Sequence, residues 1–526
     1  MRGRRVNARV AVIGAGIGGL TSAALLAARG ADVTVFEKES WVGGKARRVA
    51  VDGAEIDGGP TVFTYRDVFD EVFAACGARL EDHVTIAQAE VIARHAWGPD
   101  ERLDLFADPL RSEDAIGTFA GAGAARGYRN FRHEAQRIFN VLEDPFLRGD
   151  KASTPLPMMW RIGPWKLGDM LAMRPFDGMW NALGQHFKDP RLQQLFGRYA
   201  TYCGSSPFAA PATLMLIAHV EARGVWLIEG GIHALAKALA GLATRQGARI
   251  RTNAPVSEVL THNGRVSGVR LASGEVIPAD IVICNGDPAA LATARFGAGA
   301  ARAVPQVPPA KRSLSAMVWY AHAETSGFDL SHHNVFFSPD YAREFREIAA
   351  GQPPSDPTVY LCATDRGAHA SAAPPIGTRE RIQIIVNAPA NGDAHDYTPE
   401  ERARCTDAMM ATLKRCGLTL EDPAPHQLMT PQDWEALFPA TGGALYGRAS
   451  HGWAASFQRQ GPKTRLPGLY CTGGATHPAA GVPMAALSGQ LAARVIEKDL
   501  ASMKPSRRAV TAGGMSMPSA RTGSTG

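Results

Sequence analysis

Short apolar runs alternate with glycine turns at the start of the chain, and this is the clearest pattern in the sequence. The run Val10–Ile13 ends in Gly14-Ala15-Gly16-Ile17-Gly18-Gly19, an alanine-rich stretch covers 20–29, and a second run, Val33–Phe36, ends at Glu37. Buried parallel strands form continuous apolar runs, and Gly-x-Gly-x-x-Gly between a strand and a helix is typical of dinucleotide sites. The pattern therefore predicts a strand–helix–strand unit that binds a dinucleotide.

Individual positions of this unit have physical roles. Gly14 permits the tight turn, Gly16 lets the main chain approach a pyrophosphate, and Gly19 allows close packing of helix on strand, so that the anion meets the helix N-terminus. Glu37 is then placed to accept hydrogen bonds from ribose hydroxyls. A glycine-rich turn that packs tightly and binds nothing is the alternative interpretation.

A second glycine cluster follows the second predicted strand. It runs Gly43-Gly44-Lys45-Ala46-Arg47, and Gly58-Gly59-Pro60-Thr61 comes shortly afterwards. Paired glycines let the main chain close over a bulky planar ligand, and Lys45 or Arg47 can meet its phosphates. A nicotinamide site does not need this cluster, whereas an extended flavin adenine dinucleotide (FAD) does.

Glycine turns that lead into predicted helices recur in the middle and near the end of the chain. Trp226–Gly231 opens a predicted helix over 232–243, and Asn263-Gly264 separates two alternating runs, which is a strong hairpin signal. We expect a β-meander plugged into a parallel sheet. In the segment 468–483, a strand and a glycine turn lead into a helix from 484 to 498, which predicts a second main-chain cradle facing the flavin ring.

Composition and charge limit the partners. The chain has 526 residues, 45% of them hydrophobic, and a net charge of +6. Residues 1–9 and 501–526 carry eight basic residues and no acid, so the body has a net charge of about −2, which argues against nucleic acid. We expect 503–526, rich in Ser, Gly, Ala and Thr, to be a disordered tail.

The seven cysteines and the N-terminus bear on location. The cysteines are scattered without a Cys-x-x-Cys pair, as expected for reduced thiols in a cytoplasmic protein. Arginines lead directly into the first strand, so we expect no removable signal peptide.

The adjacent His332 and His333 would point apart in a strand, so no metal site is predicted.

Four blocks resemble one known family. Gly14–Gly19 with Glu37, Gly43-Gly44-Lys45, Glu229-Gly230-Gly231 to Leu239, and Thr476-His477-Pro478 to Pro483 resemble the bacterial-type carotenoid (phytoene) desaturases, flavoproteins of the amine-oxidase-like superfamily. The stretches 196–202, 218–226 and 330–337 are similar to the hydroxyneurosporene (1-hydroxycarotenoid 3,4-) desaturase subfamily.

The resemblance implies an α/β fold with three parts. These are a discontinuous Rossmann-type FAD-binding domain of the amine-oxidase and glutathione-reductase type, an interrupting mixed β-sheet substrate domain, and a helical membrane-facing lobe. The corresponding ranges are 1–72, 224–290 and 462–502 for the FAD-binding domain, 73–110 and 291–461 for the substrate domain, and 111–223 for the helical lobe.

The resemblance also implies the chemistry, which is FAD-dependent dehydrogenation at C-3,4 of an acyclic 1-hydroxycarotenoid. A cation on a long polyene is spread over many double bonds, so positioning does most of the work. His477 and Glu229 are the tentative proton acceptors, although a structural polar role suits each of them better. The predicted cofactor-binding residues are Gly14, Gly16, Gly18, Gly19, Glu37, Gly43, Gly44, Lys45, Arg47, Gly59, Pro60, Thr61, Val256, Gly473, Gly474, Val482 and Pro483.

Two further expectations concern the final electron acceptor and a contact with the membrane. The near-miss motifs at 121–123 and 297–299 are interpreted as loops, so a second dinucleotide fold is not expected and oxygen or a quinone becomes the candidate acceptor. Phe176, Met179, Trp180, Leu183 and Phe187 lie at helical spacing within a segment rich in Trp and Met, from 158 to 180. This segment predicts either a peripheral membrane contact that admits substrate or an ordinary core helix.

Three rival functions remain open. A phytoene or other carotenoid desaturase would keep every FAD motif. An amine oxidase of the same fold would need a polar, aromatic-caged pocket. A non-catalytic prenyl-binding protein, similar to the GDP-dissociation inhibitors, would bind no flavin.

Overall fold

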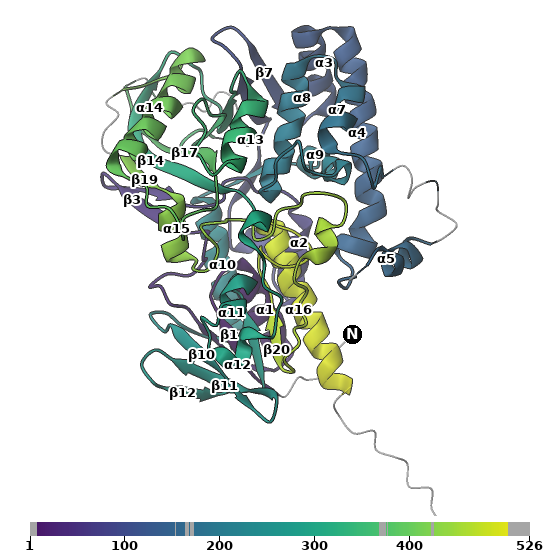
Figure 1. The fold of residues 1–526 in the computed structure, drawn as a ribbon, viewed down its shortest axis with the longest axis vertical. Helices are drawn as coiled ribbons and strands as arrows, with labels where there is room; N and C mark the ends of the chain where they lie inside the picture. The colour runs from purple at the N-terminus through teal and green to yellow at the C-terminus, as the bar shows by residue number, and fades with distance from the viewer. Residues whose placement is uncertain are drawn as a thin grey trace, which may run out of the picture.

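Three structural regions surround a shared centre in the computed structural model (Figure 1). The structure describes residues 8–502 except 153, 164–167, 169–172, 368–374, 376 and 422–425. A parallel sheet and its helices lie at the bottom of Figure 1, a large mixed sheet at the upper left, and a cluster of helices at the upper right. The predicted tail, 503–526, and the arginines of 1–7 fall outside the described residues.

The parallel sheet is assembled from three distant stretches of chain. Its strand order is β20-β13-β1-β2-β9, and every neighbouring pair is parallel. The strands are β1 (Arg9–Ile13), β2 (Asp32–Phe36), β9 (Arg249–Arg251), β13 (Ile281–Cys284) and β20 (Leu469–Cys471).

Both faces of this sheet are covered, which explains its unbroken apolar runs. Val10 and Val12 pack into the core beneath the helices, whereas Ala11 and Ile13 face the opposite side and pack with the β-meander. The helices of this region are α1 (Ile17–Ala28), α2 (Asp67–Ala75), α10 (Gly231–Arg245) and α16 (Val482–Ser502), with the short α11 (Pro288–Ala292) and α12 (Ala298–Ala301).

The β-meander differs from the prediction in one respect. Its strands, β10 (Val256–His262), β11 (Arg265–Leu271) and β12 (Val276–Pro278), form a separate antiparallel sheet and do not join the parallel one. Asn263 and Gly264 both have positive φ angles, 50° and 72°, as a tight hairpin turn requires. The meander therefore covers a face of the parallel sheet without extending it.

The mixed sheet forms the second region. Its path is β18-β14-β17-β16-β15-β6-β7, β19 also pairs with β14, and only the β15–β6 pair is parallel. The strands are β6 (Val91–Ala96), β7 (Arg102–Phe106), β14 (Ser315–Ser326), β15 (His333–Phe336), β16 (Val359–Ala363), β17 (Glu380–Ala388), β18 (Thr419–Glu421) and β19 (His426–Met429). Its helices are α13 (Tyr341–Ala349), α14 (Pro399–Arg415) and α15 (Pro431–Leu437), with the one-turn η6 (Pro309–Lys311) and η7 (Ala455–Gln458).

Helices make up the third region. Its core contains Phe131, Phe187 and Phe196, whose ring centroids lie 4.7–5.4 Å apart. The elements are α3 (Pro109–Ala120), α4 (Ala122–Leu142), η2 (Glu143–Leu147), α5 (Pro155–Ile162), α7 (Met179–His186), α8 (Pro190–Gly197), η4 (Arg198–Cys203), η5 (Ala212–Met215) and α9 (Leu216–Ala222). Two hairpins, β3 (Arg48–Val51) with β4 (Ala54–Asp57) and β5 (Ile86–Gln88) with β8 (Trp226–Ile228), and the short η1 (Leu80–Asp82) complete the fold.

One expectation about helices is decided between its two alternatives, and a second is wrong. Met179, Leu183 and Phe187 are buried together in the core of the third region, as the core-helix alternative predicts, whereas Phe176 is exposed and precedes α7, which begins at Met179. The segments 121–123 and 297–299 are helix starts, since Gly121 and Gly297 are the residues that precede α4 and α12.

Candidate functional site

The N-terminus of α1 is shaped for close approach of a ligand. Gly14 has a φ of 96°, and Gly16 precedes the helix without a side-chain cap. A Cβ on Gly19 would stand 2.4 Å from the Gly14 carbonyl oxygen, so the predicted close packing of helix on strand is present. The first-turn N–H groups of α1 are thus left for a ligand, as at anion sites on helix N-termini.

The second and third glycine loops lie against this turn. The Gly43 N–H donates to the Ala15 carbonyl at 2.8 Å. A Cβ on Gly59 would stand 1.7 Å from the Lys45 carbonyl oxygen, so only glycine fits there.

The C-terminal loop closes the cradle. A Cβ on Gly18 would stand 2.8 Å from the Gly473 main-chain nitrogen. Asn285, which follows β13, donates from Nδ2 to the Gly14 carbonyl at 3.3 Å. Glycine segments from four parts of the sequence therefore meet at one crevice.

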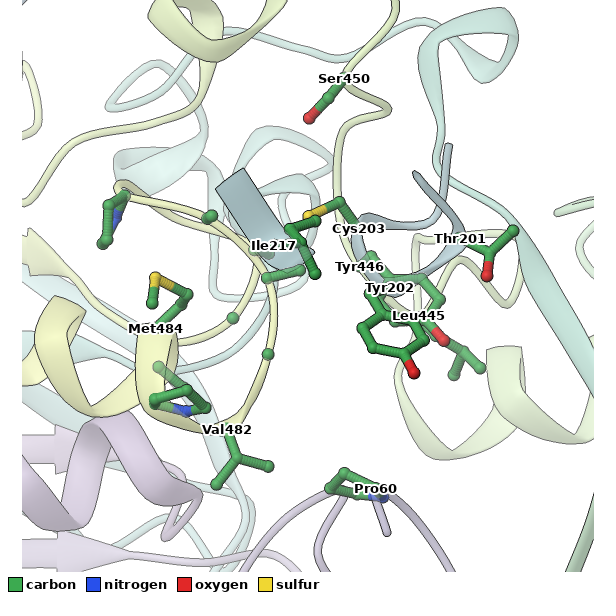
Figure 2. Close-up of a pocket in the computed structure, with 18 of the residues that line it drawn as sticks. Pro60, Thr201, Tyr202, Cys203, Ile217, Leu445, Tyr446, Ser450, Val482 and Met484 are labelled. Atoms are coloured by element: carbon green, nitrogen blue, oxygen red, sulfur yellow. The ribbon is translucent and has the colours of Figure 1, made fainter. Parts of the chain in front are cut away.

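A cavity of about 670 Å³ runs from this crevice into the space between the mixed sheet and the helices. In the view of Figure 2, Val482 and Met484 lie on one side and Tyr202 and Cys203 on the other, with Pro60 below. The predicted cofactor residues that line the cavity are Gly16, Gly18, Gly43, Lys45, Gly59, Pro60, Thr61, Gly473, Gly474, Val482 and Pro483.

The other predicted cofactor residues lie outside this lining. Gly14, Gly19 and Gly44 shape the turns behind it, and Val256 begins β10. Glu37 is buried and accepts a hydrogen bond from the Ala15 N–H at 2.7 Å. A ribose contact by Glu37 and a cofactor contact by Val256 therefore stay predictions.

Arg47 does not reach the cavity. Its guanidinium lies 5.5 Å from the Trp434 ring centroid, and its Nε and Nη2 atoms have no hydrogen-bond partner among the described residues. The expectation that Arg47 meets a phosphate is not supported by this geometry.

Lys45 is the cationic residue of the second glycine loop that does line the cavity. Its Nζ donates to the Leu445 carbonyl and lies 5.3 Å from the Phe438 ring centroid. Burial lowers the pKa of Lys45 to about 8. A ligand with negative charge would compensate for that desolvation.

A polar cluster was missed by the sequence analysis as a site. Arg198 and Tyr202 from η4, Glu221 from α9 and Tyr360 from β16 line an otherwise apolar part of the cavity. The signal in the sequence was the presence of a guanidinium and a carboxylate in stretches that otherwise build a core, because such groups are rarely buried without a purpose.

Neither tentative proton acceptor lines the cavity. Glu229 is exposed before α10, which removes the geometric support for its catalytic role. His477 is buried, its Nε2 lies 3.2 Å from the Gly149 carbonyl oxygen, and burial lowers its pKa to about 4. Its ring packs edge-on against Phe146, which does line the cavity.

The two adjacent histidines do not point apart. His332 precedes β15 and so escapes the alternation of a strand, and its ring centroid lies 4.6 Å from that of His333. With Cys362 they place three candidate ligand atoms within 4.8 Å of one another. Their Nδ1 atoms already bond to the Arg366 carbonyl and the Tyr360 hydroxyl, at 2.6 and 2.7 Å, so the absence of a metal remains a prediction.

These features fit FAD. Main-chain groups at the start of α1 suit a pyrophosphate, and the cavity beside them is of the size that holds a large ring system.

None of the helices in the described part of the chain is long and apolar enough to cross a bilayer.

Comparison with known proteins agrees with this geometry. Residues 179–497 match the family of flavin containing amine oxidoreductases, and residues 12–77 match the NAD(P)-binding Rossmann-like domain. The chain is 51% identical over 520 residues to a hydroxyneurosporene desaturase from Rubrivivax gelatinosus, covering 98% of each protein. It is 44% identical to a second hydroxyneurosporene desaturase, from Cereibacter sphaeroides, covering 95% of this chain and 99% of that one.

A solved structure supports the fold. An oxidoreductase from Methanosarcina mazei superposes with a TM-score of 0.59 at 17% identity, covering 93% of this chain and 100% of that one. The chain is thus an FAD-dependent oxidoreductase, and it belongs to the flavin containing amine oxidoreductase family, in the group that holds the hydroxyneurosporene desaturases.

Proposed function

We propose that this protein dehydrogenates the C-3,4 bond of acyclic 1-hydroxycarotenoids such as 1-hydroxyneurosporene. The observation that carries the proposal is the continuous cavity, because it joins the glycine cradle to an apolar chamber. Similarity to two hydroxyneurosporene desaturases along nearly the whole chain supports the same substrate class.

The lining of the chamber suits a polyene better than an amine. Aliphatic and aromatic side chains from all three regions face it, whereas an amine oxidase would need a polar, aromatic-caged pocket. The apolar lining includes Leu142, Phe146, Met158, Leu214, Ile217, Val318, Ile385, Trp434, Phe438 and Phe457.

Bound FAD supplies the acceptor of the hydride that leaves the substrate. The chain itself contributes the main-chain cradle, the exclusion of water by the apolar walls and the orientation of the polyene. We retain His477 only as a residue that positions the loop at 477–483, because its ring reaches Phe146 and not the cavity. Water then takes the substrate proton, and oxygen or a quinone is the final acceptor of the two electrons.

We further propose that the cavity opens toward a membrane. Phe176 and Trp453 line the cavity, are 78% and 50% exposed, and lie 5.8 Å apart between ring centroids. On α5, Leu156 and Trp160 are 64% and 73% exposed. Exposed Trp, Phe and Leu side chains favour the bilayer interface, which borders the hydrocarbon core in which an insoluble substrate is dissolved. Trp165 and Met170, which belong to the predicted membrane segment, lie outside the described residues.

The test is a reconstitution in liposomes with 1-hydroxyneurosporene or phytoene, under oxygen or with a quinone under nitrogen. We expect a flavin spectrum and a longer chromophore from the hydroxylated substrate only. Equal conversion of phytoene would favour a broader carotenoid desaturase. A colourless protein that binds polyenes without converting them would favour a prenyl-binding role, and turnover of amines alone would overturn the proposal.

A further inference from the structure

The polar cluster of Arg198, Tyr202, Glu221 and Tyr360 brings charged and hydroxyl groups to one wall of the chamber. We propose that it is the subsite that binds the hydroxyl group of the substrate, and that Arg198 recognises this group by donating a hydrogen bond to it. This inference rests on the proposed function, since it assigns a role within the same cavity.

Arg198 has donors to spare. Its guanidinium lies at the cavity wall, and its Nη1 donates to the Tyr202 hydroxyl at 3.2 Å. That is its only side-chain hydrogen bond within the described residues, and no described carboxylate lies within ion-pair distance. A guanidinium has five N–H donors, so most of them are left to face a ligand.

The guanidinium is held in place from two sides. Its central carbon lies 5.2 Å from the ring centroid of Tyr202 and 5.3 Å from that of Tyr360. The Tyr202 hydroxyl donates in turn to Glu221 Oε1 at 3.1 Å, and the Tyr199 hydroxyl donates to the other carboxylate oxygen. The hydrogen-bonded network therefore fixes the cation before a ligand arrives.

The charges of the cluster suit a neutral ligand. Arg198 and Glu221 bring one basic and one acidic group to the same wall, so a carboxylate or an ammonium ligand would meet a like charge there. An alcohol can accept from the guanidinium and donate to a remaining lone pair of Glu221. Among neutral polar groups, a hydroxyl satisfies both partners with one atom.

The position of the cluster matches the proposed site of dehydrogenation. With bonds of about 1.5 Å, an oxygen on C1 stays within about 5 Å of C3 and C4. The hydroxyl subsite must therefore border the cofactor cradle and cannot lie at the far end of the chamber. Tyr360, which packs under Arg198, bonds through its hydroxyl to Thr61 at 2.6 Å, and Thr61 belongs to the third glycine loop of the cradle.

Binding of a substrate without the hydroxyl would be disfavoured by desolvation of Arg198. Such a substrate would cover the free donors of Arg198 with hydrocarbon, and unpaired buried donors are the basis of strong discrimination in polar subsites. The cluster thus both attracts hydroxylated carotenoids and disfavours those that lack the group.

The experiment compares binding and turnover of 1-hydroxyneurosporene and of neurosporene, which lacks the hydroxyl group. Binding is followed by quenching of protein fluorescence, since Trp434 and Trp453 line the cavity. The variants are Arg198→Gln and Tyr202→Phe, with Arg343→Gln as control, because Arg343 is an exposed guanidinium paired with Glu347 on α13. Flavin content and thermal unfolding of each variant monitor folding.

We expect Arg198→Gln to raise the Kd for 1-hydroxyneurosporene by about 10- to 100-fold, the effect of one charge-assisted hydrogen bond. The Kd for neurosporene should stay within about threefold or fall, because no hydrogen bond to that ligand is lost and fewer donors are left unpaired beneath it. Tyr202→Phe should give a weaker effect of the same kind, and Arg343→Gln none. Arg198→Lys should restore part of the preference.

Two results would overturn the assignment of the subsite. One is a wild-type protein that binds both carotenoids equally, and the other is a loss in Arg198→Gln that is the same for both. A preference for the hydroxylated ligand without any conversion of it would instead leave the subsite standing and refute the proposed function.

Discussion

The two halves of the cavity bind by different means. The cofactor half is made by main chain: the uncapped start of α1, the Gly43 loop and the Gly473 loop, which approach so closely that side chains are excluded. The substrate half is made by side chains, apolar ones from the helices and the mixed sheet with the polar cluster among them. Main chain cannot change its chemistry by substitution, whereas a side-chain wall can, so substrate preference can vary while the cofactor stays the same.

The largest expected effect is loss of bound flavin on a substitution in the cofactor half. Gly18→Val places a side chain against the Gly473 main chain, 2.8 Å from its nitrogen already at Cβ, and closes the cradle. We expect a folded protein with less than about a tenth of a flavin per chain, because main-chain approach to the pyrophosphate is blocked. Absorbance at the flavin maximum per mole of protein measures this.

The matched control is Gly178→Val. Gly178 precedes α7 with a φ of −77°, and a Cβ added to it would meet no described atom within 4 Å. Full flavin content in both variants would mean that the phosphate cradle lies elsewhere.

The next effect concerns binding to the membrane, from which we expect the substrate to enter the substrate half of the cavity. The double variant Leu156→Glu, Trp160→Glu should bind vesicles more than about 100-fold less tightly, because each large apolar side chain contributes about 1.5 kcal/mol or more on burial. Cosedimentation with vesicles measures the partitioning. Val276→Glu on β12, which replaces another exposed apolar residue, should have no effect. If the control weakens binding as much, α5 is not the membrane contact.

The smallest effect tests the charged side chain in the cofactor half. Burial lowers the pKa of Lys45 to about 8, and nearby phosphates would raise that pKa, so FAD binding would take up a proton above pH 8. Affinity for FAD should therefore be constant below pH 8 and fall above it, by up to about tenfold per pH unit. Titration of flavin-free protein with FAD across this range measures it.

Lys45→Met should remove this pH dependence. Lys463→Met, which removes an exposed lysine paired with Asp499, should keep it. An unchanged slope in Lys45→Met would mean that Lys45 does not face the phosphates.

The cofactor half could be predicted because its determinants are local. A strand, a glycine turn and a helix follow one another within 9–28, and their spacing alone identifies the unit. Glu229 lies outside the cavity for a physical reason: Gly231, two residues further on, is needed to clear Asp57, which accepts the Ile232 N–H at 2.5 Å and so caps α10. That glycine block starts a helix and does not line the cavity.

The substrate half could not be predicted in the same way. The polar cluster comes from three separate stretches, which hold Arg198 with Tyr202, Glu221, and Tyr360, and only the packing of the helices on the mixed sheet brings them together. Alternation and helical spacing indicate that a side chain is buried, but they do not indicate which other buried side chains it meets. The choice between a membrane contact and a core helix around α7 was left open for the same reason, since core packing and lipid contact require the same residue types.

The order of strands in the parallel sheet bears on how the protein is made. Strand β1 lies between β2, which follows shortly in the chain, and β13, which is synthesised some 270 residues later, and the edge strand β20 follows β13 by about 190 residues more. Contacts of such long separation slow folding and leave apolar edges uncovered meanwhile. A nascent chain thus cannot complete its flavin crevice until residues 469–502 have left the ribosome, so free FAD should bind only after that point.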